Sequence, residues 1–147
     1  MNFNELFESF SNIKIAVLGD AMLDTYWWGN TERISPEAPV PVVSVSKKEQ
    51  RIGGAGNVAL NLASLGSPVH LISVLGNDEE AEMLEKLLAE KKIGTGYVLK
   101  SEGRVTTNKI RIISRNQHMM RLDAEISTPL SAAEEDALLE NFKNYLE

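Results

Sequence analysis

Two short apolar segments that each end at a glycine set the fold class of this 147-residue chain. Residues 13–18 (IKIAVL) and residues 69–75 (VHLISVL) are both followed directly by glycine. Apolar runs of this length, bounded by turn residues, are typical of buried strands rather than helices. Residues 57–65 and 79–92 carry helical patterns between and after them. Strands that alternate with helices predict an α/β fold with a mostly parallel sheet flanked by helices.

Capping residues support the predicted helices. Gly66 is placed to end the first helix, and Asp78 to cap the second, whose first turn is acidic. Ser131 and Glu134 have the spacing of a capping box, which predicts a last helix that runs to the end of the chain.

Composition and charge exclude several classes of protein. The chain has no cysteine, and its two histidines, His70 and His118, are far apart in the sequence, so we expect no metal site. A net charge of −6 argues against a nucleic-acid partner. No apolar run is long enough to span a bilayer, and residues 1–10 contain acidic but no basic side chains, unlike a signal peptide. We expect a cytoplasmic protein without a membrane partner.

Asp20 and Asp24 follow the first predicted strand and are the first candidate site residues. Ligands of open α/β sheets gather beyond the carboxyl ends of the strands. Two carboxylates there are suited to accept hydrogen bonds from sugar hydroxyls. A solvated, capped loop fits the same spacing equally well.

The glycine cluster at residues 53–56, followed by Asn57, opens the first predicted helix. Glycine allows a ligand to approach the backbone, and a helix start presents free N–H groups. Gly54, Gly56 and Ala59 also fit a dinucleotide-binding fingerprint, but charged residues rather than a buried strand precede them. A tight turn that needs glycine for packing is the alternative.

Basic residues cluster on the predicted strand over 106–114 and just after it. Lys109 and Arg111 share one face of this strand, and Arg115 follows; a further strand is expected around 119–122. In an acidic chain, such a cluster is suited to receive the phosphate of a phosphorylated sugar. An ordinary solvated face is the more common origin of this pattern.

Residues 26–46 differ in kind from the rest of the chain. They contain Trp27, Trp28, three prolines and an alternating segment over 40–46. Alternation interrupted by proline predicts edge strands, in a small sheet that stands off the main body. The two tryptophans are suited to cover a substrate or to meet a partner subunit, and core packing of one of them is an equal alternative.

These features together resemble the ribokinase or pfkB family of carbohydrate kinases. The first signature of that family is matched by the glycine cluster with Asn57, Ala59, Gly66 and Gly76. The string GDAMLDTYWWGNTERISPEAPVPVV, with residues 107–123, resembles one branch, the D-glycero-D-manno-heptose 7-phosphate kinases. The resemblance covers nearly the whole chain and fades after Asp123.

The resemblance implies a parallel α/β core that carries a small β lid within residues 26–46, through which such kinases often form homodimers. It implies that the sugar hydroxyls are held by Asp20, Asp24, Gly54 and Asn57. It implies that the sugar phosphate is held by Lys109 and Arg111, with help from Arg115. Lid residues on this basis are Trp27, Trp28, Pro39 and Val40.

The family's later glycine-rich signature, with its aspartate base and anion hole, has no counterpart here, since the last glycine is Gly103. We therefore expect residues 1–147 to be the amino-terminal, sugar-binding portion of a kinase domain whose ATP-binding portion is absent. The full-length enzyme is expected to use ATP and Mg²⁺, and this portion alone is expected to be inactive and to bind neither well. Without the strands that normally pair beside it, the sheet is expected to keep an open edge.

Other functions remain open at this point. A kinase for another sugar, such as ribose or fructose, fits the same signature. A non-catalytic sugar-binding or dimerisation module fits a chain without the catalytic portion. A nucleotide-dependent oxidoreductase is a distant third, because the only fingerprint lies in the wrong context.

Overall fold

The computed structural model describes residues 2–147, in which four helices and eight strands are formed. In chain order they are α1 (Phe3–Phe10), β1 (Ile15–Leu18), β2 (Ala21–Ile34), β3 (Pro41–Gly54), α2 (Ala55–Ser64), β4 (Val69–Ile72), β5 (Val74–Gly76), α3 (Glu79–Glu90), β6 (Leu99–Ser101), β7 (Asn108–Ser114), β8 (Gln117–Ala124) and α4 (Ala132–Leu146).

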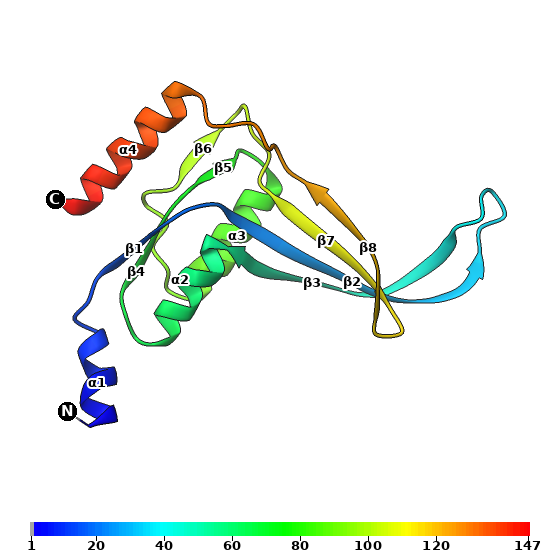
Figure 1. The fold of residues 1–147 in the computed structure, drawn as a ribbon, viewed down its shortest axis with the longest axis horizontal. Coiled ribbons are helices and arrows are strands. Elements are labelled where there is room, and N and C mark those ends of the chain that lie inside the picture. The colour runs from blue at the N-terminus through cyan, green and yellow to red at the C-terminus, as the bar shows by residue number, and fades with distance from the viewer. Residues whose placement is uncertain (1) are drawn as a thin grey trace.

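The hydrophobic core lies between short parallel strands and two helices. β1 pairs with β4 and β5 pairs with β6, both in parallel register. Helices α2 and α3 pack near these strands, while α1 and α4 lie toward the outside (Figure 1). Leucine side chains of β4, β5 and α3 are fully buried: Leu71, Leu75, Leu84 and Leu88. The predicted α/β fold is confirmed.

The largest sheet is mixed rather than parallel. Its order is β3-β2-β7-β8, in which β2 and β7 are parallel and the two outer pairs are antiparallel. The hairpin of β2 and β3 projects away from the helices (Figure 1). Burial decreases along β2 from Leu23, which is inaccessible to solvent, to Ile34, which is exposed. The sheet therefore has one end rooted in the core and one end in solvent.

The hairpin is longer than the predicted 26–46, and β7 and β8 extend the same sheet. The charged residues before the glycine cluster belong to β3, as an exposed strand that runs without a loop into α2. Gly54 makes this junction with φ +57°, and a Cβ there would lie 2.2 Å from the carbonyl oxygen of Asp20. Only glycine fits such a position.

The second apolar segment forms two strands instead of one. It breaks at Ser73, whose Oγ accepts a hydrogen bond from the Ala21 backbone N–H at 3.2 Å. The first segment is less buried than predicted, because only β4 pairs with β1 among residues 2–147. Leu18, at the end of β1, remains 56% exposed.

The capping predictions are confirmed. The Asp78 side chain accepts from the Ala81 N–H at the start of α3, and the capping box of Ser131 and Glu134 is complete at the start of α4. Helix α3 ends two residues earlier than predicted, since Lys92 adopts a positive φ of 58°.

Candidate functional site

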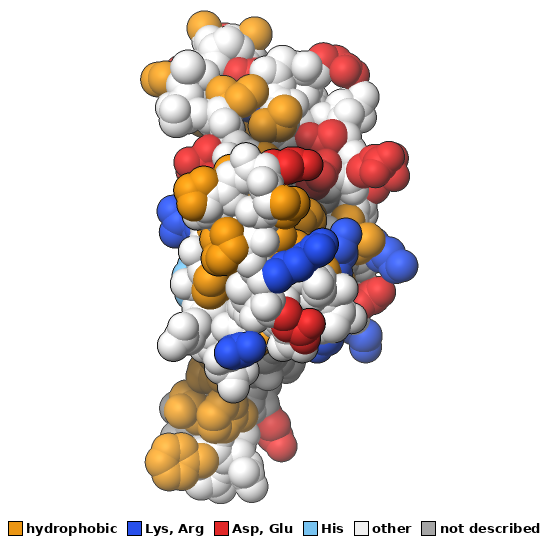
Figure 2. All heavy atoms as spheres, turned by 90° about the vertical axis from the view of Figure 1, so that its right-hand side faces the viewer, with side chains coloured by type: hydrophobic (Ala, Val, Ile, Leu, Met, Phe, Trp, Pro, Cys, Tyr) orange, Lys and Arg blue, Asp and Glu red, His pale blue; other side chains and the backbone are white. Residues whose placement is uncertain are grey.

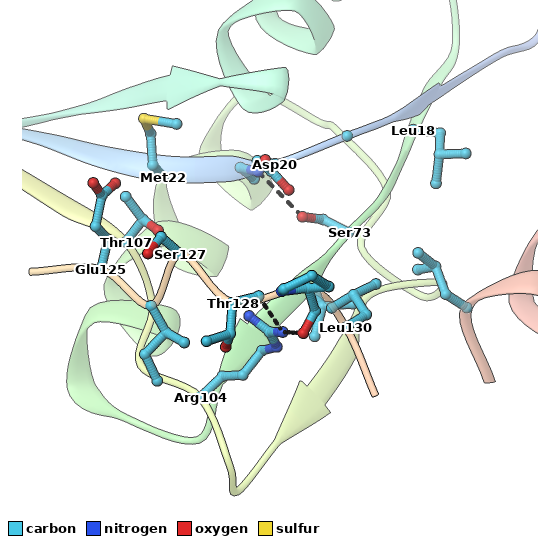
Figure 3. A pocket seen from close by; sticks show the side chains of 16 residues that line it. Leu18, Asp20, Met22, Ser73, Arg104, Thr107, Glu125, Ser127, Thr128 and Leu130 are labelled. Carbon is cyan, nitrogen blue, oxygen red and sulfur yellow. Dashed lines mark hydrogen bonds between the residues drawn. The ribbon is translucent and has the colours of Figure 1, made fainter. Parts of the chain in front are cut away.

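A cavity of about 570 Å³ lies beyond the carboxyl ends of β1 and β4. It is lined by the β1–β2 junction, by the break between β4 and β5, and by the 125–130 segment before α4. Figure 3 shows Asp20 and Ser73 on one side of this space, with Thr128 and Arg104 across from them. This is the place where open α/β sheets collect their ligands.

The lining of the cavity is rich in hydroxyl and carboxylate groups. Asp20 contributes one carboxylate and Glu125 a second, with hydroxyls from Ser73, Thr107 and Ser127. Groups of this kind accept and donate hydrogen bonds to polyhydroxylated ligands. Sequence reasoning found Asp20 and missed the other four, because they come from loops and strand ends that carry no periodic pattern.

Arg104 fixes the wall of the cavity formed by the 125–130 segment. Its Nη2 donates to the carbonyl oxygens of Thr128 at 3.0 Å and Pro129 at 2.8 Å. Its Nε donates to Glu134 at 3.2 Å, and the Ser101 hydroxyl donates to the same carboxylate at 2.6 Å. Hydrogen bonds from Ser101 and from Ser131, aided by Arg104, lower the pKa of Glu134 to about 2.

Asp24 lies on β2 outside the cavity and forms an ion pair with Arg111 of β7. The pair forms because β2 and β7 are parallel, with Asp24 beside Lys109 and Tyr26 beside Arg111. The two residues were predicted to bind different parts of a ligand. The structure brings them into direct contact.

Lys109 connects this pair to the cavity. Its Nζ contacts Asp123 at 3.3 Å and Glu125 at 3.0 Å, and Glu125 also lines the cavity. The hydrogen bonds that Lys109 donates to Glu125 and Asp123 raise its pKa. Burial raises the pKa of Asp123, but hydrogen bonds from Arg121 and Lys109 outweigh it, so the net pKa is lowered. The cavity and the sheet surface beside it are therefore continuous.

We call this sheet surface the charged face; it carries both cationic and acidic side chains, which come from four strands. Figure 2 shows basic side chains beside acidic ones in the middle of the side toward which the hairpin projects. The members of the charged face are Asp24, Lys47, Glu49, Arg51, Lys109, Arg111, Arg121 and Asp123.

Gly54 and Asn57 lie at the start of α2. A side chain on Gly54 would collide with the carbonyl oxygen of Asp20 and approach Met22, and both of those residues line the cavity. Asn57 is exposed in the first turn of α2 and is not among the cavity-lining residues. The glycine cluster thus borders the cavity, whereas Asn57 lies outside its lining.

Arg115 lies apart from the other predicted phosphate ligands. It occupies the turn between β7 and β8 with φ 49°, and its Nη2 donates to the Thr31 carbonyl at 3.2 Å. Ser114 lies five positions after Lys109 on β7, which places Arg115 roughly 16 Å or more from Lys109 along the sheet. The structure does not bring Arg115 to Lys109 and Arg111.

The predicted lid residues divide between the two faces of the hairpin and its turn. Trp28 stacks on Tyr26 with centroids 6.2 Å apart, on the charged face. Trp27 points to the opposite face, where Lys48 Nζ lies 4.6 Å from its ring centroid. Pro39 and Val40 form part of the turn between β2 and β3, and Val40 is exposed.

Residues 2–147 contain no cluster of three or more His, Cys, Asp or Glu side chains placed to hold a metal ion. We assign no step through a metal to these residues. In the same part of the chain, no helix is both long and apolar enough to cross a membrane.

The sequence of this chain is similar to sequences of known carbohydrate kinases. The family model described as pfkB family carbohydrate kinase matches residues 12–147. The bifunctional protein HldE of Haemophilus influenzae (strain PittGG) is 53% identical over 116 residues, which cover 79% of this chain and 24% of that protein. HldE of Syntrophotalea carbinolica is 43% identical over 143 residues, or 97% of this chain and 29% of that protein. This chain thus spans about a quarter of the length of the curated relatives it matches.

Solved structures share the fold. A putative sugar kinase from Clostridium perfringens superimposes with a TM-score of 0.70 at 20% identity, over 89% of this chain and 41% of that chain. Arabidopsis thaliana ribokinase, solved with ribose and ATP, gives a TM-score of 0.59 at 18% identity, over 86% of this chain and 42% of that chain. The fold of the described residues is ribokinase-like.

Proposed function

This chain belongs to the pfkB family of carbohydrate kinases, and from that premise we propose that residues 1–147 form the sugar-binding portion of a heptose phosphate kinase. The enzyme would transfer the γ-phosphoryl group of ATP to the anomeric hydroxyl of D-glycero-D-manno-heptose 7-phosphate. The products are the 1,7-bisphosphate, ADP and a proton. The sequence resemblance to heptose 7-phosphate kinases and the HldE relatives support this substrate.

One observation carries the proposal: the hydroxyl- and carboxylate-lined cavity continues into a surface that contains basic side chains. Glu125 belongs to the cavity and contacts Lys109, and Lys109 neighbours the Asp24–Arg111 pair. A sugar with one phosphate presents hydroxyls at one end and a dianion at the other. The cavity suits the hydroxyls, and the adjoining basic side chains suit the dianion.

Asp24 is suited to two roles in this proposal. Its Oδ1 accepts from Arg111 and so orients that guanidinium toward the ligand. Its Oδ2 borders Gly53, where a Cβ would lie only 2.6 Å away, so glycine leaves this oxygen room to accept a sugar hydroxyl. Asp20, which lines the cavity, would accept hydrogen bonds directly from sugar hydroxyls.

ATP and Mg²⁺ would bind to a portion of the enzyme that follows these residues. We also propose that the enzyme acts in the cytoplasm, in the supply of heptose for bacterial lipopolysaccharide. The hairpin would act as a lid over the sugar and as the surface of a homodimer. Exposed Ile34, Val40 and Val45 near its turn support that surface.

Calorimetric titration of this chain with heptose 7-phosphate, ribose and ATP tests the proposal. We expect saturable binding of the heptose phosphate, weaker binding of ribose and no binding of ATP. Asp20→Asn should lower the affinity for heptose 7-phosphate by about tenfold to a hundredfold, which corresponds to the loss of one charge-assisted hydrogen bond. Glu90→Gln, an exposed carboxylate at the end of α3, is the matched control and should bind as the unchanged chain.

A folded chain that binds ribose as tightly as heptose 7-phosphate would favour a kinase for an unphosphorylated sugar. A folded chain that binds none of these sugars would contradict the assignment of the cavity.

A further inference from the structure

Arg51 of β3 lies on the charged face, beside residues already assigned to the sugar phosphate. It is opposite Asp24 in the antiparallel register of β2 and β3. Its guanidinium Cζ lies 4.7 Å from the centroid of the Tyr26 ring, and its Nε contacts Glu49 at 2.6 Å. No pattern in the sequence singles out this arginine, because it stands in a run of charged residues.

A second guanidinium reaches the same tyrosine from the other side. Arg111 of β7 places its Cζ 5.3 Å from the Tyr26 centroid. β3 and β7 are the two neighbours of β2, so one ring on the central strand collects an arginine from each neighbour. Aromatic faces attract and orient guanidinium groups. The Tyr26 ring therefore holds both guanidinium groups at one place on the charged face.

The two arginines differ in how available they are. The Arg111 side chain is 23% exposed and is held by the Asp24 carboxylate, whereas the Arg51 side chain is 54% exposed. The partner of Arg51, Glu49, also contacts Lys47 at 2.7 Å. An anion that takes Arg51 from Glu49 leaves that carboxylate still paired with Lys47. The rearrangement leaves no charge without a partner.

We infer that Arg51 is a specificity-determining residue, which binds the phosphate group of the phosphorylated sugar together with Arg111 over the ring of Tyr26. This inference rests on the proposed function and extends it. Two planar guanidiniums offer paired N–H donors to the oxygens of one phosphate dianion. An unphosphorylated sugar makes no use of them, so Arg51 discriminates between the two substrate classes.

The experiment compares heptose 7-phosphate with unphosphorylated D-glycero-D-manno-heptose by calorimetric titration of the intact chain. Arg51→Gln should lower the affinity for the phosphorylated sugar by about tenfold to a hundredfold. The affinity for the unphosphorylated sugar should stay within about twofold of that of the unchanged chain. Arg51→Lys keeps the charge but loses the planar fork, so it should restore only part of the affinity. Lys48→Gln is the matched control: it also removes one positive charge from β3, but its side chain lies over Trp27 on the opposite face of the sheet. We expect it to bind both sugars as the unchanged chain.

The outcomes separate the two proposals. If the unchanged chain binds no heptose 7-phosphate, the proposed function fails, and the role of Arg51 fails with it. If the chain binds it and Arg51→Gln binds it equally well, only the role of Arg51 is overturned. Equal losses of affinity for both sugars, or the same loss in Lys48→Gln, would reduce Arg51 to a structural or general electrostatic contribution and also overturn its proposed role. The exposure of Arg51 predicts unchanged circular dichroism for every variant.

Discussion

The α/β core and the four-stranded sheet are stabilised in different ways. In the core, Leu71 of β4, Leu75 of β5 and Leu84 and Leu88 of α3 are at most 1% exposed. In the sheet, every residue of β8 is exposed, and ion pairs link β7 to β8 and β2 to β7 across the charged face. Buried apolar area provides most of the stability of a small domain, and exposed ion pairs provide little. The comparison indicates that the core, rather than the charged face, supplies most of the free energy of unfolding.

The largest expected change is a loss of stability when a core side chain is truncated. Leu84→Ala removes a fully buried side chain from α3 and should cost about 2–5 kcal/mol of unfolding free energy. Urea unfolding followed by circular dichroism measures it. Met120→Ala on β8, where the side chain is 56% exposed, should change that free energy by less than about 0.5 kcal/mol. Comparable losses from the two variants would remove the distinction between core and sheet.

The next effect is at the junction of the two regions. Gly54→Ala places a methyl group against the Asp20 carbonyl at a positive φ, which should cost about 1–3 kcal/mol in strain and displace the cavity wall. Unfolding and sugar titration should therefore both be affected. Gly66→Ala also changes a glycine with positive φ, but it has open space around its Cβ position, so it should affect stability without affecting binding.

A smaller effect on stability, which depends on pH, is expected from Glu134 of α4, which contacts Ser101 and Arg104. The pKa of Glu134 falls from 4.5 to about 2 on folding. A lowered folded pKa means that the contribution of this carboxylate is complete above about pH 4.5 and is lost as pH decreases toward 2. Thermal unfolding between pH 6 and pH 2.5 should thus show a steeper decline for the unchanged chain than for Glu134→Gln. Parallel curves would show that the carboxylate does not couple to folding.

The smallest change in stability is expected for a substitution on the charged face. Arg121→Gln breaks the 2.8 Å contact with Asp123, but the arginine side chain is 51% exposed and Asp123 keeps Lys109. The thermal midpoint should stay within experimental error of the unchanged chain. A marked decrease would mean that the ion pairs stabilise the sheet as a network, contrary to the comparison above.

Some local elements could be predicted from the sequence, whereas α1 and β6 were not predicted. Apolar runs, capping residues and glycines act over a few neighbours, so the helices over 55–64 and 79–90 and the caps at Asp78 and Ser131 follow from short patterns. The break at Ser73 was missed because its cause is a hydrogen bond to Ala21, which is 52 residues away.

The sequence by itself determined the α/β class, the caps at Asp78 and Ser131 and the family signature, since each depends on residues close together in the chain. Only the tertiary structure decided which candidates meet. Strand register pairs Asp24 with Arg111, joins Lys109 to Glu125 and sets Arg51 over Tyr26, while it leaves Arg115 at a distant turn. Register arises from pairing between segments far apart in the chain, because each side chain must match a partner on another strand. For that reason the sequence identified candidates such as Asp20 and Lys109, whereas Glu125, Arg51 and the arrangement of all these residues emerged only from the fold.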